Sequence, residues 1–122
     1  MKTLVLSFAA LASASLLIGA PAATAHHSFA MFDNAKEQTL VGTVKEFQWT
    51  NPHTWLQLMV DESGKQVEWS IEGSSPNGLA RRGWSRTSFK PGDKVTVIIH
   101  PLKDGAKGGS YVKATLPDGK TL

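Results

Sequence analysis

The chain has 122 residues, no cysteine and a formal net charge of +3. Without cysteine it forms neither disulfide bonds nor thiolate metal sites, so the fold must be held by packing alone. The excess of basic over acidic residues is small and is scattered along the chain, which does not favour nucleic acid as a partner.

The first 25 residues predict a secretory signal peptide. Lys2 supplies the positive start, the run from Leu4 to Ala20 is apolar, and Ala23-Thr24-Ala25 fits a small-residue cleavage site. The apolar run is too short and too rich in alanine and serine for a convincing membrane span, and no second one follows. We therefore expect a periplasmic protein, cleaved after Ala25, whose mature part is a single domain covering residues 26–122.

The mature chain opens with an extended arm, which we expect Phe29 and Phe32 to pin to the domain. Three runs rich in β-branched and aromatic residues follow and predict a strand meander over residues 38–49, 53–60 and 66–72. Asn51-Pro52 makes the first corner and Gly64 suits the hairpin loop after it. Gly42, inside the first run, indicates a bulge or a close approach of another backbone.

The stretch from Gly73 to Pro91 lacks a strand pattern and contains a short helix signature, with Ser75 as the cap, Pro76 first in the helix and Gly83 past its end. Two more strands are predicted, over residues 94–100 and 110–116, with inward side chains at positions 95, 97, 99, 112, 114 and 116. Three strands, a helix and two strands are the element order of an OB-like five-stranded β-barrel. A plain β-sandwich is the competing all-β architecture.

The second strand carries two different faces. Alternation places Thr54, Leu56, Leu58 and Val60 on an apolar core face. The opposite face carries His53, Trp55, Gln57 and Met59. An outward row of a small soluble protein is expected to be short, polar or charged, so this row suggests a binding role.

Four motifs are similar to those of a family of short exported bacterial proteins known only as a domain of unknown function. They are the His-His-Ser-Phe start at His26, Trp49-Thr50-Asn51-Pro52-His53 followed by Trp55, the pair Glu68-Trp69, and Lys90-Pro91-Gly92-Asp93. The resemblance covers essentially the whole mature chain and implies a periplasmic location without implying an activity. A weaker resemblance links His53, Trp55 and Met59 to periplasmic OB proteins that carry Cu(I) with His, Met and Trp. Gln57 and the single Met of the row depart from that pattern.

Copper is the cofactor that these residues favour. Cleavage after Ala25 gives His26 a free α-amine beside its imidazole, and such a nitrogen chelate suits Cu(II). It resembles the histidine brace of copper-dependent oxygenases. The thioethers of Met31 and Met59 suit Cu(I). The candidate metal ligands are His26, His27, His53, Met59, Met31 and His100.

The alternative function is an accessory module that binds an envelope protein or a glycan through exposed tryptophans, namely Trp49, Trp55 and Trp84. Trp69 keeps the register of a core residue. Glu68 and Glu72 share a strand face, and we expect them to be solvated rather than to act as a catalytic pair. No complete catalytic set is recognisable, which favours a binding protein over an enzyme.

Overall fold

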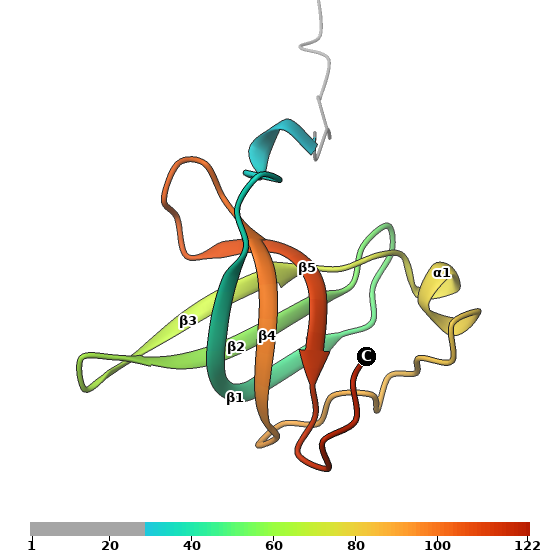
Figure 1. Cartoon of the computed structure of the whole chain (residues 1–122). Coiled ribbons are helices and arrows are strands. Elements are labelled where there is room, and N and C mark those ends of the chain that lie inside the picture. Colours follow the sequence, from blue (N-terminus) through green and yellow to red (C-terminus); the bar gives the residue numbers. More distant parts are fainter. Residues whose placement is uncertain (1–28) are drawn as a thin grey trace, which may run out of the picture.

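The computed structural model describes residues 29–122 of the chain (Figure 1). It contains a 3-10 turn, η1 (Phe29–Met31), then β1 (Gln38–Gln48), β2 (Trp55–Glu62), β3 (Lys65–Glu72), the helix α1 (Pro76–Ala80), β4 (Lys94–Pro101) and β5 (Gly108–Thr115). Within the described part of the chain, no helix is long and apolar enough to cross a membrane.

The five strands close into a barrel in the order β1-β2-β3-β5-β4. β3 and β5 pair in parallel, and every other neighbouring pair is antiparallel. β1 is long enough to serve both sides, since residues 38–43 pair with β4 and residues 42–48 pair with β2. Closure confirms the predicted OB-like barrel over the sandwich.

The barrel interior is filled by the side chains that strand alternation predicts. Leu56, Leu58 and Val60 of β2 are buried, as are the alternating Val95, Val97 and Ile99 of β4. Trp69 is also in this core, at 5% exposure. Period-two burial on both strands shows that the apolar pattern sets which face turns inward.

Gly42 lies where β1 passes close to β2. A Cβ at Gly42 would stand 2.5 Å from the carbonyl oxygen of Met59 and 2.9 Å from the Leu58 side chain, so only glycine fits. The bulge of this strand lies further on, where the pairing with β2 skips Lys45 between Val44 and Glu46. The prediction of a close backbone approach is confirmed at Gly42 itself.

The last strand corrects the predicted inward set. Ala114 is buried as expected, but the pairing with β4 skips Val112, because Ile98 faces Lys113 while Ile99 faces Tyr111. This bulge turns Tyr111 inward in place of Val112. β5 also begins at Gly108, two residues before the predicted start, because glycines add no side chain to the pattern that marks a strand.

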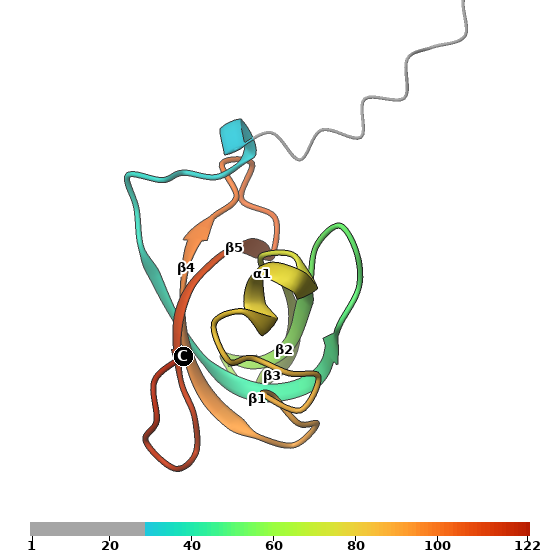
Figure 2. The ribbon, with the colours of Figure 1, turned by 90° about the vertical axis from the view of Figure 1, so that its right-hand side faces the viewer.

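The helix α1 covers one open end of the barrel (Figure 2). Ser75 caps it, since its side chain accepts a hydrogen bond from the Gly78 N–H at 3.2 Å. Leu79, at 3% exposure, points from the helix into the barrel mouth. The cap and the buried leucine together explain why so short a helix is held in place.

Candidate functional site

A buried carboxylate lies beside a histidine at the α1 end of β2 and β3. Glu72 is 7% exposed, and its Oε1 is 3.3 Å from Nδ1 of His53. Backbone hydrogen bonds from Gly73 N to Thr54 O and from Thr54 N to Ser74 O bring the two strand ends together. A Cβ at Gly73 would stand 2.4 Å from the Thr54 hydroxyl, so glycine is required for this approach.

The neighbours of His53 define its tautomer. Nδ1 faces the Glu72 carboxylate and, at 3.2 Å, the carbonyl oxygen of Gly73. Both groups are acceptors, so Nδ1 carries the proton and donates. In the neutral ring the lone pair then lies on Nε2, which is the atom that can bind a metal ion.

A mostly apolar hollow of about 130 Å³ lies between Glu72 and the N-terminal arm. Met31 and Trp55 line it together with Glu72, and Gly108 and Gly109 form part of its wall. The arm is fixed there by hydrogen bonds from Lys103 N to Met31 O and from Asp33 N to Pro101 O, and Phe32 is buried as predicted. The structure therefore brings Met31 to the Trp55 end of the predicted row.

The other predicted metal ligands are spread apart. Met59 lies four residues beyond Trp55 on β2, about 13 Å along the strand, where it pairs with Thr43 and Glu68. His100 lies on β4, and its Nδ1 is 2.8 Å from the carbonyl oxygen of Lys36. Among residues 29–122, no three His, Cys, Asp or Glu side chains gather closely enough to hold a metal ion. His26 and His27 lie outside the described residues.

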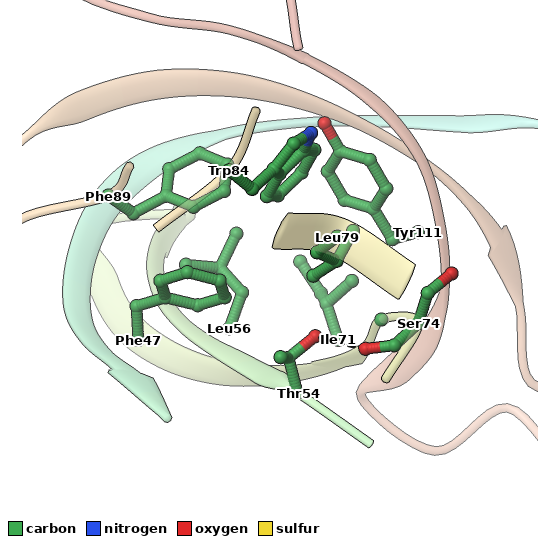
Figure 3. A pocket seen from close by; sticks show the side chains of 10 residues that line it. Phe47, Thr54, Leu56, Ile71, Ser74, Leu79, Trp84, Phe89 and Tyr111 are labelled. Carbon is green, nitrogen blue, oxygen red and sulfur yellow. Dashed lines mark hydrogen bonds between the residues drawn. The ribbon is translucent and has the colours of Figure 1, made fainter. Parts of the chain in front are cut away.

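Two of the three predicted contact tryptophans belong to an aromatic cluster at the barrel mouth. Trp49 packs edge-on against Phe47 with ring centroids 5.9 Å apart, and Trp84 lies 6.3 Å from Phe47 and 5.2 Å from Tyr111. Trp84 lies with Phe47, Phe89 and Tyr111 around Leu79 of α1, and these rings leave a void of only about 10 Å³ (Figure 3). Trp84 therefore helps to plug the barrel, Trp49 contacts only the Phe47 edge of the cluster, and Trp55 lies on the outer face of the barrel.

Burial in this cluster raises the pKa of Tyr111 above its ordinary value near 10, although the positive charge of Arg82 opposes the shift. The Tyr111 hydroxyl donates a hydrogen bond to the carbonyl oxygen of Leu122 at 2.8 Å. This contact holds the last residue against β5. The hydroxyl is therefore a structural donor at the edge of the mouth.

The prediction that both glutamates of β3 are solvated is correct for Glu68 and wrong for Glu72. Glu68 is exposed and pairs with Nζ of Lys45 at 2.9 Å, as a surface residue does. Glu72 is buried instead, because the end of β3 packs against the turn that contains His53. Alternation along β3 correctly put both on one face but could not show that another segment covers one of them.

The fold and this pair of side chains define the class of the molecule: a small OB-type β-barrel with a carboxylate-oriented histidine at its mouth. The mitochondrial single-stranded DNA-binding protein of S. cerevisiae has a similar fold, with a TM-score of 0.50 and 13% identity over 67% of this chain and 94% of that one. A family model described as a family of unknown function, DUF6152, matches residues 12–112, and the chain belongs to this family. No curated protein matches the chain.

Proposed function

We propose that the chain is an exported periplasmic protein that binds copper at the His53–Glu72 end of the barrel. The observation that carries the proposal is the fixed orientation of the His53 ring. Its Nδ1–H faces the Glu72 carboxylate at 3.3 Å and the Gly73 carbonyl at 3.2 Å. Metal-binding histidines usually have such an outer-shell acceptor, which fixes the ring and the tautomer. Nε2 of His53 is then the first donor.

The N-terminal arm supplies the remaining donors in this proposal. Met31 lines the same hollow as Glu72 and is 42% exposed. Five peptide units separate it from His26 and span at most about 17 Å when extended. That reach supports a site shared by the arm and the barrel, with the amine and imidazole of His26 and the imidazole of His27 joining His53.

The chemistry of these donors favours copper over other metals. Amine and imidazole nitrogens suit Cu(II), and the thioether of Met31 suits Cu(I). Without cysteine, the site lacks the thiolate ligands that structural zinc sites usually employ. We expect Cu(II) to depend mainly on the nitrogen donors, and Cu(I) to depend more on Met31.

The test is a titration of the mature protein with Cu(II), and with Cu(I) under a reductant, followed by native mass spectrometry and calorimetry. We expect one ion per chain. His53→Ala and a one-residue extension before His26 should each remove stoichiometric binding. Glu72→Gln should weaken it about 10- to 100-fold, because the ring loses its charged acceptor.

His100→Ala is the matched control. This residue is also a histidine whose Nδ1 faces a carbonyl, but it lies on β4, against Lys36. It should leave copper binding unchanged. The proposal is overturned if the mature protein takes up no copper, or if neither His53→Ala nor the extension alters the titration. Mass spectrometry of the secreted chain checks its export and the position of cleavage. The proposed copper site requires His26 to be the first residue of the mature protein.

The accessory-module alternative depends on tryptophans that a partner can reach. Trp55 is the best candidate of the three, because it lies on the outer face and lines the arm-side hollow. If this alternative is right, Trp55→Ala abolishes capture of an envelope protein or glycan, while copper has no effect on it. Copper binding by the Trp55→Ala variant would separate the two functions.

A further inference from the structure

Thr54 is a buried hydroxyl residue at the head of a row of aliphatic side chains. It is 1% exposed and shares its face with the buried Leu56 and Leu58 of β2. A buried hydroxyl costs free energy unless it is hydrogen-bonded, and Oγ1 of Thr54 donates to the carbonyl oxygen of Ser74 at 2.9 Å. Valine has nearly the same shape, so packing alone does not explain the hydroxyl.

Three hydrogen bonds join Thr54 to the segment that follows β3, and we call them the Thr54 clamp. One is the hydroxyl bond. In the other two, the Thr54 N–H donates to the Ser74 carbonyl oxygen at 3.2 Å, and the Gly73 N–H donates to the Thr54 carbonyl oxygen at 2.8 Å. The clamp lies just past the last ladder pair of the two strands, Trp55 with Glu72. It therefore fixes the chain on both sides of the Gly73 carbonyl.

The Gly73 carbonyl is the group that the clamp orients. Its oxygen is 3.2 Å from Nδ1 of His53. Only glycine fits at this position, because a Cβ would stand 2.4 Å from Oγ1 of Thr54. Glycine also has more backbone freedom than any other residue, so its carbonyl needs an outside restraint. The bonds to Gly73 N and to the Ser74 carbonyl supply that restraint and keep the carbonyl between them facing the ring.

We propose that Thr54 is a positioning residue for His53. Its hydroxyl orients the Gly73 carbonyl, and this acceptor and the Glu72 carboxylate together keep the proton on Nδ1 and the lone pair on Nε2. The inference rests on the proposed function, because it names a further residue that sets the copper affinity of the same site. Thr54 acts through Gly73 and is not itself a ligand.

Thr54→Val tests this role, because it removes the hydroxyl and keeps the shape. The variant should fold, since the main-chain N–H of position 54 still donates to Ser74. The ¹⁵N NMR signals of the His53 ring are recorded without copper at about pH 8.5, where an imidazole is neutral, and are assigned with His53→Ala. We expect the Nδ1–H pattern in the natural chain and signals averaged between both tautomers in the variant. Copper affinity should fall about tenfold, as for the loss of an outer-shell partner.

Thr54→Ser should restore both the ring signals and the copper affinity, because it keeps the hydroxyl. Thr54→Ala repeats the loss of the hydroxyl without the second methyl group of valine, in case that group is not accommodated. Thr96→Val is the matched control. Thr96 lies on β4, and its side chain makes no hydrogen bond to a residue of the described part of the chain, so this variant should change neither measurement.

The positioning role is overturned if the His53 ring signals of Thr54→Val and Thr54→Ala match those of the natural chain. It is also overturned if these variants bind copper as tightly as the natural chain, or if Thr54→Ser behaves as they do. The ring signals are measured without metal and so test the clamp independently of the copper site. Altered ring signals in a protein that binds no copper would overturn the proposed function and support the role of Thr54 in holding the ring.

Discussion

At the scale of single residues, glycines and buried side chains determine how closely the strands approach. Gly42 and Gly73 both sit where a Cβ would overlap a neighbouring segment, at 2.5 Å from Met59 O and 2.4 Å from Thr54 Oγ1. The first approach closes β1 onto β2. The second brings His53 to Glu72. Gly42 therefore supports the closed barrel, and Gly73 supports the candidate site.

Gly42→Ala tests the first of these approaches. The added methyl group would meet a backbone carbonyl that cannot move without disturbing the ladder, so we expect a loss of about 1–3 kcal/mol in the free energy of unfolding. Gly78→Ala is the control, because its nearest neighbour is the Ser75 hydroxyl at 3.2 Å and alanine favours a helix. Urea denaturation of both variants checks this. Equal stability of the two would contradict it.

Tyr111 gives a prediction about pH. Burial raises its pKa in the folded state, so the unfolded chain loses this proton first, near pH ~10. Its contribution to stability is complete below that pH and falls as the pH rises further, by at most about 1.4 kcal/mol for each pH unit.

The comparison with Tyr111→Phe isolates this effect from the titration of lysines. The difference in unfolding free energy between the two proteins should be constant from pH 7 to 9 and should shift in favour of the variant above pH 10. Because Tyr111 is the single tyrosine of the sequence, tyrosinate absorbance reports on it alone. An onset of that absorbance near pH 10 in the folded protein would contradict the prediction.

At the scale of elements, α1 covers one end of the barrel, where its Leu79 lines the void between the aromatic rings. It has five residues, too few to be stable alone, so its cap and the burial of Leu79 must hold it. The bulge on β5 cooperates with it by turning Tyr111 toward Trp84. The aromatic cluster at the barrel mouth thus depends on a short helix and on a strand irregularity that meet there.

Ser75→Ala tests the hold on α1. Loss of the bond to the Gly78 N–H should lower the free energy of unfolding by about 1 kcal/mol. It should also broaden the NMR signals of Leu79 and Arg82. Ser74→Ala, at the adjacent exposed position, removes a hydroxyl that has no role in the cap and should change stability by less than about 0.5 kcal/mol. Denaturation curves of equal midpoint would contradict a capping role.

At the scale of the whole molecule, the basic excess is not scattered along the chain as expected but is concentrated in its second half. Residues 33–72, which include β1 to β3, contain seven acidic and three basic residues, while residues 73–122 contain three acidic and nine basic ones. OB-folds bind oligonucleotides on the face around their second and third strands. In this barrel, exposed acidic side chains lie on β1, β2 and β3, namely Glu46, Asp61 and Glu68. Lys45 is paired with Glu68.

This distribution predicts that the barrel does not bind single-stranded DNA, although its fold resembles that of a DNA-binding protein. Phosphate binding requires basic side chains along the groove, and the acidic strands repel the backbone. Fluorescence anisotropy with an oligothymidine at about 150 mM salt should show no saturable binding. Micromolar affinity would contradict the prediction, and replacing Glu46 and Glu68 with lysine should increase any residual binding.

Local pattern determined most of the architecture of this protein. Alternation along β2 and β4 defines the core face, Gly42 marks a close approach, and Ser75, Pro76 and Gly83 mark the helix, because each signal acts over a few residues. The order of these elements was enough to predict an OB-like barrel. The sequence also named His53 and Met31 among the candidate metal ligands, and their role in one site stays a prediction.

Only the tertiary structure decided what lies beside those residues. Glu72 reads as a solvated strand residue, yet it is buried next to His53 because segments twenty residues apart meet at Gly73. The inward turn of Tyr111 follows from a bulge that depends on pairing with β4, and Met59 and His100 are separated by strand geometry. Contacts between distant segments leave no periodic trace in the chain, since each segment satisfies its own pattern whichever neighbour it meets.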